Sequence, residues 1–323
     1  MSKLKHIQEF LKANKTKYIL GIVVLIVVDG LQLIIPKLLE FLTDSLKADV
    51  LSMKQIYLYG FLIIAIAIVV AIFRYVWRML IMGSSRELEF WLRNKLFSHL
   101  EKLSLNYFHH KKTGDLMAHA TNDINAVRMA LGMGVVMFTD AIFLSISTIF
   151  IMFISIDRKL TLIALFPLPF MTFAIAYFGK MIQKRFKNVQ ESFAFLTDKT
   201  QESFSGVRVI KSFVQETNEV ANFALINDNY LKNNMSLIKV WGMMFPLVIF
   251  MSALSFVITL YFGGNLVIDK AISLGQFVAF ISYLGLLTWP MMAIGYVINV
   301  LQRGMASLIR LNQIFDSIPE VYD

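Results

Sequence analysis

Six long apolar blocks, separated by alternately short and long connections, constrain this chain more than any other feature. The chain has 323 residues, of which 57% are hydrophobic and 16% are charged. A soluble domain carries about 25% charged residues, and about 20 apolar residues are enough to cross a bilayer core of roughly 30 Å. We therefore predict an all-α, multi-pass membrane protein. Its spans are residues 18–43, 54–82, 130–155, 159–180, 240–266 and 276–300.

The positive charges orient these spans. The two long connections, residues 83–129 and 181–239, are rich in Lys and Arg, whereas the short links are nearly free of them. Positively charged loops stay on the cytoplasmic side of a membrane. Both long connections and both termini are therefore expected in the cytoplasm. Residues 1–17 carry five lysines and form a cytoplasmic N-terminal elbow, and the block after them is too long for a cleaved signal peptide.

The long connections have a helical pattern of their own. A leucine stripe recurs at helical spacing, which also suits plain packing against neighbouring helices: Leu88, Leu92, Leu96, Leu100 and Leu103. It predicts one helix over about residues 53–107, roughly 80 Å long at 1.5 Å per residue. Breaks at residues 111–115 and 203–206 lie midway along the two connections. Each break fits either a simple turn or a contact with a cytoplasmic partner.

Three helix starts on the outer side are marked by capping residues. Ser52 with Gln55 and Ser273 with Gln276 have capping-box spacing, in which the side chains of both residues satisfy backbone amides. Asp157 has the side chain to cap the fourth span. These residues predict where the helices begin and carry no chemistry.

Four separated motifs give the chain a family resemblance. Residues 106–125 include Lys112-Thr113-Gly114-Asp115, and residues 201–213 include Phe204 and Gly206. Residues 157–162, and residues 273–280 followed by 310–320, supply the other two. In this order they resemble the transmembrane domain of ABC exporters, over essentially the whole chain.

The resemblance implies an architecture and a partner. Two six-helix halves would assemble, with the fourth and fifth helices swapped into the other half. Short coupling helices at about residues 107–113 and 201–210 would dock on nucleotide-binding domains, so that ATP-driven closure switches access across the membrane. The implied docking residues are Phe108, Lys111, Thr113, Gly114, Asp115, Glu202, Phe204, Gly206 and Arg208.

The phosphate-binding loop of such ATPases is missing from this sequence. No G-x-x-x-x-G-K-[ST] segment occurs in it. We expect residues 18–310 to be the transmembrane domain and residues 311–323 to start a linker to a nucleotide-binding domain outside the chain. The chain itself then needs no cofactor, and ATP and Mg²⁺ belong to the full-length transporter. His119 stands where the family commonly has Arg. The segment around His119 most resembles that of bacterial multidrug-resistance subunits. This departure leaves open whether the protein is a homodimer or a heterodimer.

Polar residues inside the spans are the candidates for substrate contact. Asp29 and Asp140 lie within apolar blocks, with Gln32 three residues beyond Asp29. Charges at such depth normally face a cavity or a partner. They would either attract cationic drugs or form a structural pairing, for example of Asp29 with Arg74 or Arg78.

A second candidate surface lies on the sixth span. Met292, Tyr296 and Asn299 share one helical face. Methionine suits promiscuous binding surfaces, although an apolar stripe in a membrane helix equally serves packing. The sequence shows neither a nucleophile–base pair nor a convincing metal-ligand set, so no catalytic residue is expected.

The predicted function is the permease domain of an ATP-driven exporter of amphipathic drugs or lipids, in a bacterial cell membrane. Its expected partners are a nucleotide-binding domain, a second half-transporter, membrane lipids and amphipathic small molecules, and not nucleic acid. The alternatives are a secondary multidrug transporter, which would show interrupted spans and an internal repeat, and a non-transporting membrane scaffold.

Overall fold

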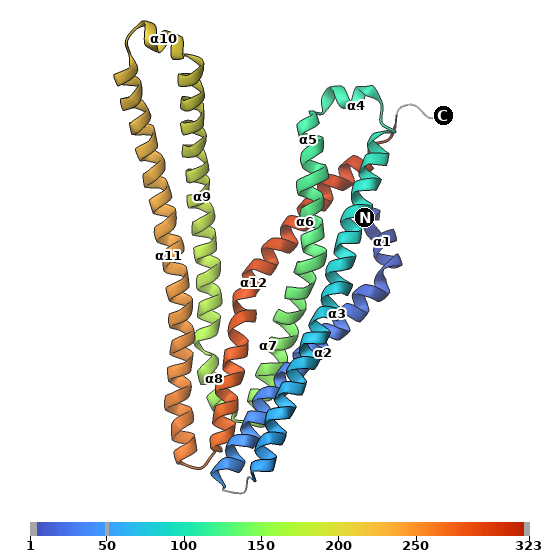
Figure 1. The fold of residues 1–323 in the computed structure, drawn as a ribbon, viewed down its shortest axis with the longest axis vertical. Helices are drawn as coiled ribbons and strands as arrows, with labels where there is room; N and C mark the ends of the chain where they lie inside the picture. Colours follow the sequence, from blue (N-terminus) through green and yellow to red (C-terminus); the bar gives the residue numbers. More distant parts are fainter. Residues whose placement is uncertain (1–4, 49–51, 320–323) are drawn as a thin grey trace. The chain divides into compact units, whose positions relative to one another are not determined.

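The computed structural model describes residues 5–48 and 52–319, and every regular element in those ranges is helical. The chain divides into two compact units (Figure 1). Unit 1 comprises Met1–Ala164 and Ile258–Asp323, and unit 2 comprises Leu165–Val257. Within the described residues, six helices are long and apolar enough to cross a membrane. The six predicted spans are thereby confirmed as helices.

Unit 1 contains most of the elements. In chain order these are η1 (Lys5–Ile7), α1 (Gln8–Ala13), α2 (Lys15–Lys47), α3 (Met53–Leu100), α4 (Leu105–His110), α5 (Thr113–Ala118), η2 (His119–Asp123), α6 (Ile124–Met129), η3 (Ala130–Gly134), α7 (Val135–Ser155), α8 (Arg158–Leu165) and α12 (Leu274–Phe315). The segment from α5 to α7 is nearly continuous, and η2 and η3 are π-helical turns within it. Such π-turns often accompany functional sites.

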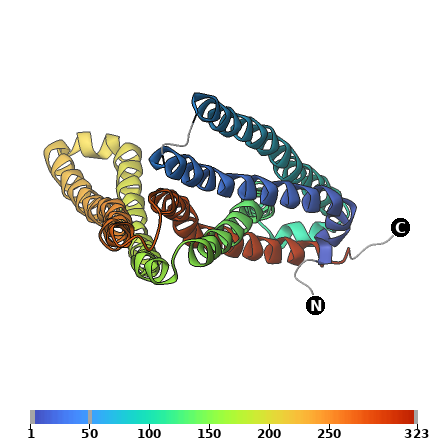
Figure 2. The ribbon, with the colours of Figure 1, turned by 90° about the horizontal axis from the view of Figure 1, so that it is seen from below.

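Several hydrophobic clusters hold the described part of unit 1 together, and two of them include its first helices. In the apolar half, α2 and α3 run side by side (Figure 1 and Figure 2), and Leu25, Val28 and Ile81 are at most 2% exposed. In the polar half, Ile7 and Phe10 of the N-terminal segment join α3, α6 and α12 in a second cluster. Each fully buried side chain of the size of Ile or Phe contributes about 1.5–3 kcal/mol to the free energy of unfolding. The N-terminal segment is thus part of the packed structure.

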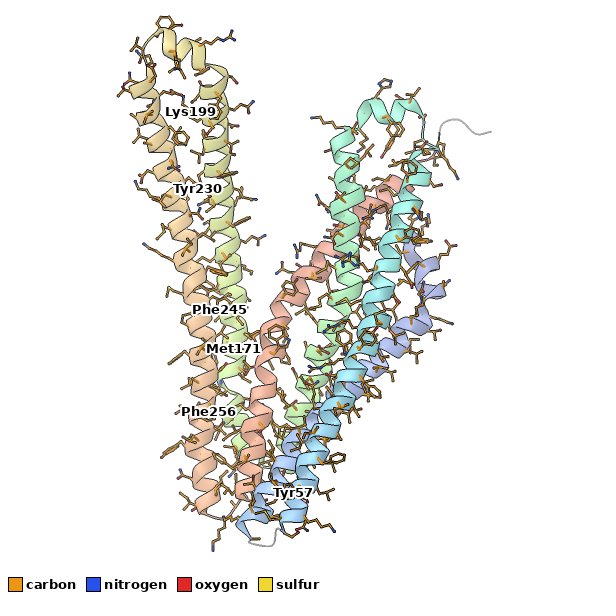
Figure 3. The ribbon with its side chains drawn as sticks, viewed as in Figure 1. Tyr57, Met171, Lys199, Tyr230, Phe245 and Phe256 are labelled. Carbon is orange, nitrogen blue, oxygen red and sulfur yellow. The ribbon has the colours of Figure 1, made fainter. Side chains whose placement is uncertain are left out.

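Unit 2 is a long hairpin of two helices. It contains α9 (Pro167–Ser205), α10 (Val207–Ser212) and the greater part of α11 (Glu216–Ile268). The helices α9 and α11 lie side by side, and Figure 3 labels Lys199 and Tyr230 along them. Lys199 pairs with Glu219 at 2.8 Å, and the rings of Phe193 and Tyr230 are 5.7 Å apart. Polar bridges near α10 and aromatic contacts further along therefore hold the hairpin closed.

The predicted helix starts are confirmed. The Ser273 hydroxyl accepts from the Gln276 amide, and the Gln276 side chain accepts from the Ser273 amide, both at 2.9 Å. The Gln55 side chain accepts from the Ser52 amide at 3.0 Å. Asp157 accepts from the Leu160 amide at 2.7 Å.

The predicted helix over residues 53–107 is wrong at its end. The helix α3 stops at Leu100, and a short turn leads to α4, which begins at Leu105. Ser104 takes an extended backbone and its carbonyl accepts from the Tyr107 amide at 3.1 Å. A serine there favours a helix start over a helix interior. The leucine stripe concealed this break, because Leu103 is buried even though it lies in the turn.

Candidate functional site

The first hairpin tip is a short, exposed helix. None of the residues of α4 is buried, and Phe108 is 40% exposed with its ring 5.6 Å from that of Tyr107. After α4, Lys111 has extended backbone, and Thr113-Gly114-Asp115 form the first turn of α5. The tip therefore presents an aromatic pair on α4, followed by a basic step and a new helix start.

The second hairpin tip is built around Gly206. The Gly206 amide donates to the Glu202 carbonyl at 2.8 Å, which ends α9, and α10 then begins at Val207. Phe204 is 76% exposed, and Arg208 is an exposed residue of α10. None of the residues of α10 is buried. The chain turns back at Val214, which has a positive φ of 52°.

Both tip helices are displaced from their predicted positions. The first covers Leu105–His110, where residues 107–113 were predicted, because Lys111 and Lys112 are extended. The second covers Val207–Ser212, where residues 201–210 were predicted, because α9 continues through Ser205 before Gly206 interrupts it. Glu202 and Phe204 consequently lie on the last turn of the long helix and not on the tip helix.

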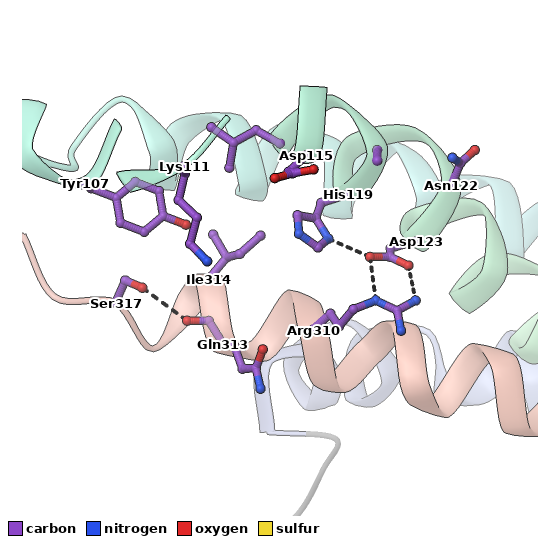
Figure 4. A pocket seen from close by; sticks show the side chains of 12 residues that line it. Tyr107, Lys111, Asp115, His119, Asn122, Asp123, Arg310, Gln313, Ile314 and Ser317 are labelled. Atoms are coloured by element: carbon purple, nitrogen blue, oxygen red, sulfur yellow. Dashed lines mark hydrogen bonds and ion pairs between the residues drawn. The ribbon is translucent and has the colours of Figure 1, made fainter. Parts of the chain in front are cut away.

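Behind the first tip lies a polar cavity of about 410 Å³ between the α4–η2 segment and the end of α12 (Figure 4). Its base is a three-residue cluster. Arg310 donates through Nε to Asp123 Oδ2 at 3.1 Å and through Nη2 to Asp123 Oδ1, and His119 Nδ1 lies 2.6 Å from Asp123 Oδ2. This cluster ties η2 to the C-terminal end of α12.

The charge state of Asp123 follows from these partners. Its partial burial alone would raise the pKa of the carboxyl. The hydrogen bonds from Arg310, His119 and Ser307 outweigh that burial and hold the pKa of Asp123 below its usual range. Asp123 is therefore an ionised partner of Arg310. Sequence reasoning assigned no role to either residue, although both lie in the quoted motifs and His119 and Asp123 have helical i,i+4 spacing.

A second set of contacts fixes the N-terminal segment to the C-terminal end of α12. His6 Nε2 lies 2.8 Å from Asp316 Oδ1, and Lys95 Nζ donates to the His6 carbonyl at 2.9 Å. Lys95 also lies 4.4 Å from the ring centre of Trp91, and burial lowers the pKa of Lys95. The sequence offered only the amphipathic spacing of α3 as a signal for this contact.

Within the apolar half of unit 1, the structure brings Asp29, Gln32 and Arg74 together. Arg74 Nη2 donates to Gln32 Oε1 at 3.0 Å, and Gln32 Nε2 donates to Asp29 Oδ1 at a longer 3.4 Å. Asp140 of α7 interacts electrostatically with both Asp29 and Arg74. The expected pairing of Asp29 with Arg74 thus runs through Gln32. Arg78 instead lies 5.8 Å from the ring centre of Trp77.

The candidate face on the sixth span forms a separate surface. Met292 is half-buried, while Tyr296 and Asn299 are exposed, opposite the buried Ala293 and Val297. Across residues 5–48 and 52–319, no hydrogen bond or ion pair joins this face to the Asp29 cluster. The predicted pathway residues therefore form two groups.

The residues that the structure describes do not fit a site for ATP and Mg²⁺. In the described part of the chain, no group of three His, Cys, Asp or Glu side chains is placed to hold a metal ion. The exposed tips carry apolar, amide, basic and acidic side chains, but no glycine-rich loop leads into a helix there.

Comparison with known proteins adds a family and several relatives. The family described as ABC transporter transmembrane region matches residues 18–291. Over 322 residues the chain is 36% identical to the Bacillus subtilis protein described as "Probable multidrug resistance ABC transporter ATP-binding/permease protein YheI", covering 100% of this chain and 55% of that protein. Over 307 residues it is 32% identical to the multidrug resistance-like ATP-binding protein MdlA of Escherichia coli, covering 95% and 52%.

A lipid-related protein is also similar. The ATP-dependent lipid A-core flippase of Syntrophus aciditrophicus is 28% identical over 232 residues, which are 72% of this chain and 38% of that protein. The chain spans about half the length of the first two relatives. These relatives thus match the chain through a region that is only part of each protein.

Proposed function

The chain belongs to the family of ABC transporter transmembrane regions, and on that basis we propose that it is the permease half of an ATP-driven bacterial exporter. Multidrug and lipid A relatives support amphipathic drugs or lipids as the substrate class. The bacterial inner membrane would hold the protein, with both termini in the cytoplasm. Residues 1–17 would form the elbow, residues 18–310 the transmembrane domain, and residues 311–323 the start of a linker.

The exposed hairpin tips carry this proposal. An apolar side chain as exposed as Phe204 is explained if a partner surface covers it, since tip helices without a buried residue have nothing of their own to pack against. The partner we propose is a nucleotide-binding domain, which supplies the ATP and Mg²⁺ chemistry. Phe108 and Phe204 would insert as anchors, and Arg208 would add a charged contact at the edge.

The remaining tip residues would position these anchors. Gly206 is the residue at which α9 ends, and Glu202 holds Lys199 at 3.3 Å on that last turn. On the first tip, Lys111, Thr113, Gly114 and Asp115 form the step from α4 into α5. Because α3 and α9 are long, rigid helices, a displacement at a tip would be transmitted toward the membrane and would switch access from one side to the other.

A second half-transporter would complete the pathway. The hairpin of unit 2 exposes large apolar side chains over its apolar part, including Phe173, Phe245 and Phe250. We propose that this hairpin packs on the other half and on lipid, as a domain-swapped arm. Co-purification with either a second copy of this chain or a different subunit decides which of them forms the other half.

Substrate contacts are proposed for two surfaces. Met292, Tyr296 and Asn299 present an adaptable, partly exposed face of α12, which suits varied apolar ligands. Asp29, Gln32 and Asp140 would contact positively charged compounds only in a conformation in which α2 has moved away from α7, because Asp29 is 3% exposed in this one.

Transport into inside-out vesicles tests the function. Vesicles containing the full-length protein are expected to accumulate a fluorescent cationic dye when ATP is added, and a fluorescent lipid in a parallel assay. Uptake that is independent of ATP but abolished by a protonophore would instead identify a secondary transporter. Absence of uptake of every probe, with correctly assembled protein, would favour a scaffold.

A further inference from the structure

Three charged side chains from three helices interact electrostatically in the apolar half of unit 1. They are Asp29 of α2, Arg74 of α3 and Asp140 of α7. Asp29 is 3% exposed, and both Arg74 and Asp140 act on it electrostatically. If all three were ionised, two carboxylates would face one guanidinium and the site would carry one uncompensated negative charge. Such a charge is costly in a low-dielectric environment.

The hydrogen bonds leave the same deficit. The guanidinium of Arg74 is joined to Gln32, and only a 3.4 Å contact continues from Gln32 to Asp29 Oδ1. Asp29 Oδ2 and Asp140 Oδ1 are both buried, and neither has a hydrogen-bond partner among the described residues. A buried carboxylate oxygen without a donor is destabilising, because nothing compensates the loss of its hydration. The site therefore lacks one positive charge and at least one hydrogen-bond donor.

The surrounding helices supply neither the missing positive charge nor the missing hydrogen-bond donor. On α2 and α7 the neighbouring buried residues Val28, Val136 and Met137 are apolar. On α12, which also packs on α2 and α7, the Tyr283 hydroxyl donates to the Leu33 carbonyl at 3.0 Å. The groups that face Asp29 with charge are thus Arg74 from α3 and Asp140 from α7, with the neutral amide of Gln32 between Asp29 and Arg74.

We propose that Asp29 and Asp140 form a proton-binding site, in which one of the two carboxyls is held as the neutral acid. One proton cancels the excess charge and adds the missing O–H donor. The proton comes from bulk water and no other bond changes. A larger cation fits less well, because Asp29 is almost completely enclosed and an organic ammonium group could reach it only after the helices separate.

This site goes beyond transport and does not depend on the proposed function. The need for the proton arises because α2 packs against both α3 and α7. A rearrangement that moved α2 away from α7 would separate the carboxyls and admit water, so that the proton would be released. Proton occupancy therefore reports the conformation of this half of the molecule.

Infrared spectroscopy of the purified protein in lipid nanodiscs tests the proposal. At neutral pH, ordinary Asp and Glu side chains are ionised, so the C=O stretch of a neutral carboxylic acid identifies the bound proton. We expect this band in the wild type, with a shift in deuterated water. Asp29→Asn and Asp140→Asn each leave one carboxylate for Arg74, so each should abolish the band. Arg74→Gln should increase it.

Glu40 provides the matched control. It is also buried, at 7% exposed, and its Oε2 has no partner in the described chain, but Lys37 lies 2.7 Å from its Oε1 and balances its charge. Glu40→Gln should leave the band unchanged. Absence of the band from the wild type at neutral pH would overturn the proposal, and so would its persistence in the Asp29→Asn/Asp140→Asn double variant. The wild-type result stands even if a variant fails to fold, and no transport is needed for either outcome.

Discussion

Arg310 binds both carboxylate oxygens of Asp123, and so joins two segments that are 187 residues apart in the chain. Arg310 lies near the C-terminal end of α12, while Asp123 ends the π-helical turn η2 behind the first hairpin tip. The two hydrogen bonds fix the orientation of the Arg310 guanidinium as well as its distance from the Asp123 carboxylate. We infer that this contact makes the tip and the end of α12 move together.

Breaking the Asp123–Arg310 contact should destabilise the protein. Hydrogen bonds to charged groups contribute about 1.5–3 kcal/mol, and Asp123 is only 7% exposed. Arg310→Gln and Asp123→Asn should each lower the free energy of unfolding within this range. Thermal unfolding in a double-mutant cycle should show strongly non-additive effects. As a control, Lys187→Gln should change little, since its 3.6 Å pair with Glu191 is solvent-exposed. Additive effects of the two core substitutions would contradict the account.

The same contact predicts a pH dependence. Because the pKa of Asp123 is held below its usual range, its stabilisation is complete above the unfolded value of about 3.9 and is lost as the pH falls through the lower folded value. The difference in melting temperature between wild type and Asp123→Asn should be constant near neutral pH and shrink only below pH of about 4. Asp228→Asn, in an exposed pair with Lys232, should show no such difference. A difference that vanished well above pH of about 4 would argue against an ionised Asp123.

The N-terminal segment should hold the C-terminal end of α12 in place. Ile7 is fully buried against α3 and α12, and an Ile→Ala change in such a core costs about 2–5 kcal/mol. Ile7→Ala should accelerate amide hydrogen exchange at residues 308–316, as measured by mass spectrometry. The exposed Lys12→Ala should not. Unchanged exchange in Ile7→Ala would show that α12 is held without the N-terminal segment.

Two glycines of α12 should respond oppositely to alanine. A Cβ at Gly304 would overlap the Ala130 side chain and lie 3.1 Å from the Ala126 carbonyl oxygen, whereas nothing lies within 4 Å of a Cβ at Gly285. Overpacking costs about 1–3 kcal/mol, while Gly→Ala in an unobstructed helix adds up to about 1 kcal/mol. Melting temperature should therefore fall for Gly304→Ala and hold or rise for Gly285→Ala. Equal shifts in melting temperature for the two variants would mean that close packing of α12 on α6 and η3 does not contribute to stability.

Local patterns predicted the spans and the helix starts well. The apolar blocks have the length that a membrane demands, and Ser273 with Gln276 or Asp157 with Leu160 satisfy amides only three residues away. The break after Leu100 was missed because Leu103 continues the hydrophobic spacing through a turn. Burial of a turn residue depends on tertiary packing, which periodicity does not report.

The candidate sites were predictable only in part. Exposed tips follow from topology, but the start of α10 depends on whether α9 continues through Ser205, which helix propensity does not decide. Asp29 was recognised as unusual, yet its link to Arg74 through the Gln32 side chain depends on how three helices pack. The contacts of Lys95 and Arg310 join distant segments, and local sequence patterns do not identify their partners.

The most direct test of the central claim is the coupling of ATP hydrolysis to the second tip. In the full-length transporter, Phe204→Ala removes the 76% exposed side chain next to Gly206, and Phe195→Ala removes a side chain that is 71% exposed on α9, further from the tip. We predict that Phe204→Ala lowers drug-stimulated ATPase activity and transport together, with normal expression and assembly, while Phe195→Ala lowers neither. Unchanged drug-stimulated ATPase and transport in Phe204→Ala would contradict the account.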